Sequence, residues 1–118
     1  MWPGIEHVFV PMERLPERFR ESFDIMVSNM AWRYFVYPDI ALKNLLQALS
    51  VGGWANIVFS CDRSPLAFED LNTRMNGSMH LLKILEKSGH IDYSFRDSGI
   101  FVSPSGYLEI TKKKSIVL

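Results

Sequence analysis

The hydrophobic positions of the chain fall into short runs that polar, glycine- or proline-containing stretches separate. The first run, His7 to Val10, is β-branched and aromatic and ends at Pro11, which cannot donate to a β-ladder. A charged loop over Met12 to Ser22 follows. The next run, Phe23 to Ser28, is almost continuously apolar, which is typical of a parallel strand covered on both faces. The pattern therefore predicts two early strands joined by a loop.

A helix and another strand follow these runs. Pro38 and Asp39 suit the first turn of a helix, and the pair Gly52-Gly53 predicts its end. The apolar face that should pack on the sheet is formed by leucines at helical spacing: Leu42, Leu45, Leu46 and Leu49. Because Trp54 to Ser60 is again apolar, we predict that Phe23 to Ser60 is a strand-helix-strand unit with a right-handed crossover.

Two further helices are predicted in the second half of the chain. Ser64-Pro65 opens a short helix that continues through Phe68 and Leu71, and Asn76-Gly77 interrupts it. A second helix over Ser78 to Ser88 carries its leucines on one face, and Gly89 ends it.

The last predicted elements are strands of an antiparallel end. Ile91 to Phe95 and Ile100 to Val102 read as strand pieces, and Asp97 to Gly99 between them is either a hairpin turn or a bulge within one longer strand. Ser103 to Gly106 fits a type I turn into a strand over Tyr107 to Thr111. The chain contains no internal repeat and no low-complexity linker, so we expect one α/β domain over residues 1–118.

Composition narrows the function classes. The 118 residues contain thirteen basic and thirteen acidic side chains, so no excess positive charge favours a nucleic-acid partner. The basic run Lys112 to Lys114 is interpreted as a solvated end of the last strand. The three histidines match no zinc spacing, so we expect no metal.

The sequence also predicts the cellular compartment of the protein. The single cysteine, Cys61, cannot form an internal disulfide and is interpreted as a buried, inert thiol, which fits a reducing cytoplasm. The first residues have neither the basic start nor the apolar run of a signal peptide, and no stretch approaches membrane-spanning length. We therefore expect a cytoplasmic protein without membrane association.

Several short motifs, each weak by itself, occur in an order that is characteristic when they are taken together. Leu15-Pro16 precedes the strand that begins Phe23-Asp24, and the leucine-rich helix leads into Leu49-Ser50-Val51-Gly52-Gly53. This order resembles the second half of the class I S-adenosylmethionine-dependent methyltransferase domain of the small-molecule type, in which an LP loop, a strand beginning FD and an L-x-P-G-G turn follow one another. Here Val51 replaces the usual proline. The similarity runs from about Ile5 to Lys113.

The resemblance implies a truncated Rossmann-like sheet with parallel strands, a crossover helix and closing antiparallel strands. The glycine-rich strand-helix unit that opens a complete domain is missing, because no G-x-G-x-G occurs in the chain. The acidic residue that usually binds the ribose hydroxyls is missing too. The resemblance therefore implies that S-adenosylmethionine binds well only if a complementing half is present, and no catalytic residue is assigned.

Loss of that unit would leave the strand over Phe23 to Ser28 at an edge of the sheet. An apolar edge strand invites pairing with another chain, so we expect a homodimer or a partner chain that supplies the missing strands. Alternatively, the strand over His7 to Val10 occupies the vacant place.

The resemblance also implies which residues face the cofactor. Met12 matches a residue that lies against adenine, and Pro11 stands where the family often has an aspartate that accepts from the adenine amino group. Glu13 is either a solvated loop carboxylate or the substitute for that aspartate. Ser28 and Asn29 match the strand end that lines the methionine moiety.

A following loop matches the one that shapes the substrate pocket in this family. We assign Met30, Trp32, Arg33 and Tyr34 to it, and core packing explains its aromatic residues equally well. The small-molecule methyl acceptor stays open, because acceptor sites vary between family members. Two functions follow: half of a methyltransferase that is inactive alone, or a non-catalytic remnant that serves as a dimeric or partner-binding module.

Overall fold

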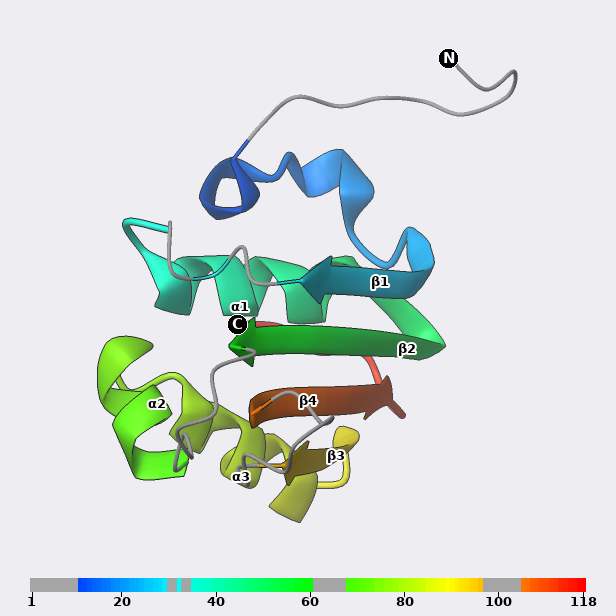
Figure 1. Ribbon diagram of the computed structural model, residues 1–118. Coiled ribbons are helices and arrows are strands. Elements are labelled where there is room, and N and C mark those ends of the chain that lie inside the picture. The colour runs from blue at the N-terminus through cyan, green and yellow to red at the C-terminus, as the bar shows by residue number, and fades with distance from the viewer. Residues whose placement is uncertain (1–10, 30–31, 33–34, 61–67, 97–104) are drawn as a thin grey trace.

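A computed structural model describes residues 11–29, 32, 35–60, 68–96 and 105–118 of the chain. Four strands form one mixed sheet in the order β1-β2-β4-β3 (Figure 1). The elements are η1 (Met12–Arg14), η2 (Glu17–Phe19), β1 (Phe23–Asn29), α1 (Pro38–Ala48), β2 (Leu49–Ser60), α2 (Phe68–Arg74), α3 (Met79–Lys87), β3 (Ile91–Arg96) and β4 (Ser105–Lys112). Strands β1 and β2 are parallel, whereas β4 is antiparallel to both β2 and β3. The predicted α/β sheet with a parallel pair and closing antiparallel strands is confirmed.

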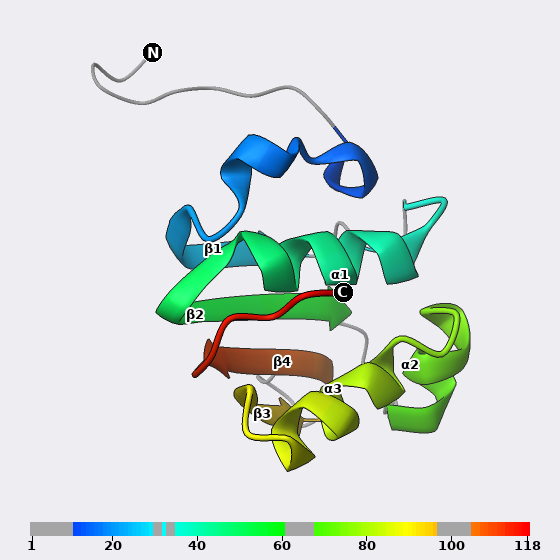
Figure 2. The same ribbon diagram turned by 180° about the vertical axis from the view of Figure 1, so that it is seen from behind.

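The helices α1 and α3 lie on the same face of the sheet. The view from behind shows both in front of the strands, with the C-terminal end of the chain running between them (Figure 2). In that view the crossover from β1 through α1 to β2 is right-handed, as predicted. No helix among the described residues is long and apolar enough to cross a membrane.

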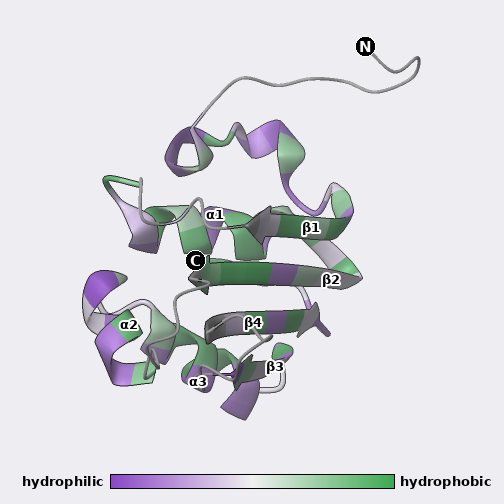
Figure 3. Ribbon diagram, in the orientation of Figure 1, coloured by the Kyte–Doolittle hydropathy of each residue, from purple (hydrophilic) through white to green (hydrophobic). Residues whose placement is uncertain are grey.

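The core lies between these helices and the sheet. Leu42, Leu45 and Leu46 of α1 are buried against it, as predicted, whereas Leu49, the fourth leucine of the predicted helix face, is buried as the first residue of β2. Alternate residues of the two central strands complete the core: Ala55, Ile57, Phe59, Leu108 and Ile110. Coloured by hydropathy, β2 has apolar stretches on either side of a hydrophilic band (Figure 3).

The opposite face of the sheet is open over β1. Ile25 and Val27 point away from the helices and expose 68% and 73% of their surface. The prediction that this strand is covered on both faces is therefore wrong, because the described helices that cover the sheet lie on one side. Within the described sheet β1 pairs with β2 alone, so it lies at the edge, and residues 7–10, predicted to fill that edge, lie outside the described part.

The end of α1 differs from the prediction. The helix stops at Ala48 and β2 begins at Leu49, so Gly52 and Gly53 lie inside the strand. There the β1–β2 register shifts between Phe23 and Ile25. Gly52 has φ +85, and a Cβ on Gly53 would lie 2.8 Å from the Ser50 carbonyl oxygen. The two glycines therefore serve an irregular strand rather than a helix end.

Other boundaries shift by a few residues. Strand β1 includes Asn29 and β3 includes Arg96, each one residue beyond the predicted end. Strand β4 begins at Ser105, so the second half of the predicted turn over residues 103–106 belongs to the strand. The predicted loop over Met12 to Ser22 contains the two short turns η1 and η2. Residues 64–67 and 97–102 lie outside the described part, so the predictions for them stay open.

Candidate functional site

The carboxyl ends of β1 and β2 point to the same side of the sheet, and α1 begins there (Figure 1). In open α/β sheets, ligands bind outside the carboxyl ends of the parallel strands. Turn η1 packs against α1 near this end. The candidate site is therefore the region between η1, the end of β1 and the start of α1.

Met12 is fixed to α1 in this region. The Asn44 side-chain amide donates a hydrogen bond of 2.8 Å to the Met12 carbonyl oxygen. The Met12 side chain is half-buried and packs against the hydrophobic core. This placement is compatible with an apolar contact for a flat ring.

Glu13 occupies the start of α1. Its Oε2 accepts a hydrogen bond of 3.2 Å from the Val36 N–H, two residues before the first helical residue, Pro38. A helix N-terminus attracts a negative charge. The other oxygen, Oε1, is enclosed and has no hydrogen-bond partner among the described residues. Glu13 is therefore a half-buried carboxylate with one enclosed oxygen, and Oε1 is an acceptor without a partner among the described residues.

The remaining predicted site residues are only partly brought together. Ser28 is half-buried near the end of β1, and Asn29 closes the strand opposite Val58. Trp32 is 4% exposed and stacks edge-on against Phe35 and Phe59 at 5.1 and 5.8 Å between ring centroids. It therefore belongs to the core.

Three predicted pocket residues, Met30, Arg33 and Tyr34, lie outside the described part of the chain, as does Cys61. The roles assigned to them stay predictions.

The basic run at the end of β4 is not solvated throughout, so its predicted role as a solvated strand end is wrong for Lys112. Lys112 is completely buried, and its Nζ donates to the carbonyl oxygens of Leu46 and Leu49 at 2.9 and 2.6 Å. Burial lowers its pKa below 10.5. The signal was present in the sequence, because Lys112 continues the inward alternation of Leu108 and Ile110 along β4.

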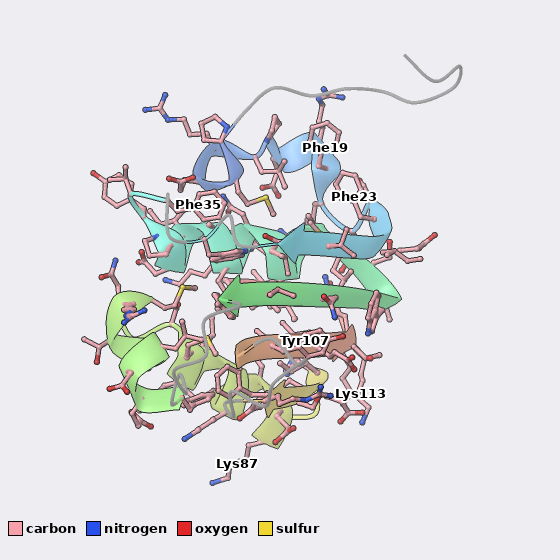
Figure 4. The ribbon with its side chains drawn as sticks, viewed as in Figure 1. Phe19, Phe23, Phe35, Lys87, Tyr107 and Lys113 are labelled. Carbon is pink, nitrogen blue, oxygen red and sulfur yellow. The ribbon has the colours of Figure 1, made fainter. Side chains whose placement is uncertain are left out.

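A polar group lies on the open face of the sheet. The Tyr107 hydroxyl, on β4 (Figure 4), donates a hydrogen bond of 2.7 Å to Glu109 Oε1. The Arg96 guanidinium lies 5.2 Å from the centre of the Tyr107 ring. The hydrogen bond to Glu109 is the main reason that the pKa of Tyr107 rises above 10.0. The polar groups of these three side chains interact with one another, and we assign no reactive group to them.

One histidine–carboxylate pair forms on α2 and α3. His80 Nε2 lies 3.1 Å from each oxygen of Glu69, and Lys83 lies 3.7 Å from the same carboxylate. Both partners are more than half exposed, so we assign the pair to surface electrostatics. Within the described residues, no group of three histidine, cysteine or acidic side chains is placed to hold a metal ion.

Comparison with known proteins leaves the family open. A scan against protein-family models and a search of curated proteins both find no match for this chain. Its function must therefore be argued from the fold and the candidate site.

Proposed function

We propose that the chain is the carboxy-terminal half of an S-adenosylmethionine-dependent methyltransferase domain, which neither binds the cofactor well nor transfers a methyl group alone. The strand arrangement carries the proposal. After the parallel pair β1–β2 and its crossover helix, the last strand, β4, enters antiparallel between β2 and β3. This agrees with the closing strands expected from the resemblance.

The described residues fit one end of the cofactor. Glu13 offers an acceptor for an amino group such as that of adenine, and Met12 offers an apolar side chain beside it. Ser28, near the end of β1, is the residue that the resemblance assigns to the methionine moiety. No glycine-rich turn follows a strand to receive the polar remainder, so these residues do not make a complete site.

Weak binding follows from this partial fit. The cofactor, when bound, supplies an electrophilic methyl group, and the protein contributes mainly the alignment of that group with the acceptor. Half a pocket aligns poorly. We therefore propose that activity requires a complementing half from another polypeptide, and that the acceptor is a small molecule of a class still to be found.

The test is isothermal titration with S-adenosylhomocysteine. The purified chain alone should give no saturable heat, whereas a mixture with a separately produced glycine-rich half of a small-molecule methyltransferase should bind. Glu13→Ala should weaken that binding, and Glu17→Ala, which changes an exposed carboxylate on the same segment, should leave it unchanged. Failure of the two folded halves to associate would overturn the proposal. Micromolar binding by the chain alone would overturn its claim of an incomplete pocket.

The exposed edge favours a second candidate function. Ile25 and Val27 present two large apolar side chains on an edge strand, so a non-catalytic remnant would be suited to a homodimer or to a partner that adds strands. Light scattering in the same buffer should then show self-association that Val27→Lys abolishes. A chain that stays monomeric at high concentration would remove the homodimer.

A further inference from the structure

The segment from Met12 to Ser22, here called the strap, runs along α1 and is held at both ends (Figures 1 and 2). Near the start of the helix, Glu13 accepts from the Val36 N–H. Near its end, the N–H groups of Glu21 and Ser22 donate to the carbonyl oxygens of Gln47 and Ala48 at 2.8 and 2.9 Å. The strap therefore covers one side of α1 over its length.

The contact of Glu21 and Ser22 with the end of α1, here called the anchor, also involves the last strand, β4. The final turn of α1 contains no basic residue, and Lys112 of β4 supplies the positive charge that its carbonyl oxygens favour. The Lys112 ammonium lies 3.6 Å from Glu21 Oε1. Glu21 therefore links the strap, through an ion pair, to the lysine that caps the C-terminal end of α1.

The C-terminal residues 113–118, here called the tail, close the same anchor. The Ser115 hydroxyl donates a hydrogen bond to Glu21 Oε1, and Arg20 donates to the Ile116 carbonyl oxygen at 3.0 Å. Ile116 is 1% exposed, so the tail is seated in the core beside this contact.

The conformation of Glu21 shows that the anchor is under strain. Its φ of 50° lies in the left-handed region, which side chains with a Cβ avoid. A glycine would fit the backbone better but would lack the carboxylate. Non-glycine residues persist in this region only where surrounding contacts hold them. Here the Gln47 carbonyl oxygen and the Ser50 hydroxyl hold the Glu21 backbone, and Ser115 of the tail and Lys112 hold its carboxylate.

We propose that the strap and tail form a conformational switch, in which the tail holds the strap closed through Glu21 and a negative charge at Ser115 releases it. Ser115 is exposed, so its hydroxyl is accessible to phosphorylation: the hydroxyl oxygen gives up its proton, bonds to the terminal phosphorus of a nucleoside triphosphate, and the diphosphate leaves. A negative group there would face the Glu21 carboxylate and compete for Lys112. Release would uncover the side of α1 beneath the strap and open the enclosed Glu13 Oε1 to solvent and ligand. Only this last consequence rests on the proposed function.

Amide hydrogen exchange, followed residue by residue, tests the switch. In Ser115→Glu, the amides of Glu21 and Ser22 should exchange at least about tenfold faster, while those of β3 and β4 stay within about twofold. Ser115→Ala, which removes only the hydrogen bond, should give a smaller acceleration at the same amides. Val117→Glu adds the same charge to the tail at a residue that is 81% exposed, and it should leave the strap unchanged.

A double variant separates repulsion from general damage. Glu21→Gln removes the opposing carboxylate, so combining it with Ser115→Glu should bring strap exchange back toward the level of Glu21→Gln alone. Unchanged exchange in Ser115→Glu, equal acceleration across the domain, or no rescue by Glu21→Gln would each overturn the switch. These results do not depend on cofactor binding, so they stand apart from the titration with S-adenosylhomocysteine.

Discussion

At the scale of single residues, a buried lysine stabilises the end of α1. Lys112 is fully buried, yet its ammonium donates to the carbonyl oxygens of Leu46, in the last turn of the helix, and of Leu49, the residue just after it, and lies near Glu21. Burying a charge costs free energy, and these partners offset it. The residue is thus a cap for a helix 64 positions away in the sequence, counted from Ala48 to Lys112.

Replacing that lysine should be costly. Lys112→Met keeps the apolar stem but leaves the Leu46 and Leu49 carbonyl oxygens without their donor, so we expect a loss of about 1–3 kcal/mol in the free energy of unfolding. Urea denaturation measures it. Lys113→Met removes an exposed pair with Asp92 and should cost less than about 0.5 kcal/mol. Equal costs for the two variants would contradict the capping role.

At the scale of elements, the junction between α1 and β2 is set by backbone contact. Gly53 lies where a Cβ would meet the Ser50 and Asp24 carbonyl oxygens at 2.8 and 3.1 Å. Neither oxygen can move without shifting the β1–β2 pair. The glycine is therefore required by close packing of backbone and not by an unusual φ.

Gly53→Ala should accordingly destabilise the fold by about 3 kcal/mol, the upper range for overpacking. Gly77→Ala is the matched control, because Gly77 has φ +80 with no atom near the added Cβ, and strain alone should cost about 1 kcal/mol. Thermal unfolding compares the two. A Gly53 variant as stable as the Gly77 variant would show that the strand irregularity can relax.

The elements differ in how far sequence could predict them. The leucines at helical spacing predict α1, and the apolar run predicts β2. Both predictions succeed because burial against one core requires apolar residues at the period of the element that is buried. The end of α1 could not be predicted in this way. Gly52-Gly53 suits a helix end and a strand irregularity alike, and the true cap, Lys112, comes from a distant strand.

The candidate site was less predictable for a similar reason. Glu13 lies in a charged segment whose composition predicts solvent exposure, whereas it is half-buried and accepts a hydrogen bond from the Val36 N–H, 23 residues away in the sequence. Trp32 was assigned to a pocket on resemblance, whereas its ring contacts with Phe35 and Phe59 place it in the core. Side-chain direction depends on neighbours that local patterns do not encode.

At the scale of the whole molecule, stability should fall in acid. The hydrogen bond from Ser115 is the main cause that lowers the pKa of Glu21 below 4.5, and the hydrogen bond from Asn76 lowers that of Asp39 below 3.8. Carboxyls with a lowered folded-state pKa stabilise the protein above their ordinary pKa, and this contribution is lost as pH falls through the folded value.

The free energy of unfolding should therefore decrease between neutral pH and about pH 3, and Glu21→Gln should make that decrease smaller. Urea denaturation across this pH range measures both. Glu17→Gln, which alters a carboxylate whose side chain is 80% exposed, is the control. If Glu21→Gln leaves the pH dependence of the free energy of unfolding unchanged, the contact between Glu21 and the tail does not contribute to that dependence.

The capping of α1 by Lys112 also has a consequence for how the protein is made. Residues 38–48 leave the ribosome well before residue 112. During synthesis, the end of α1 and Glu21 therefore lack the ammonium group of Lys112. Contacts so distant along the chain form late and slow the folding reaction. The nascent chain should therefore gain its stable form in one late step, once β4 has inserted between β2 and β3.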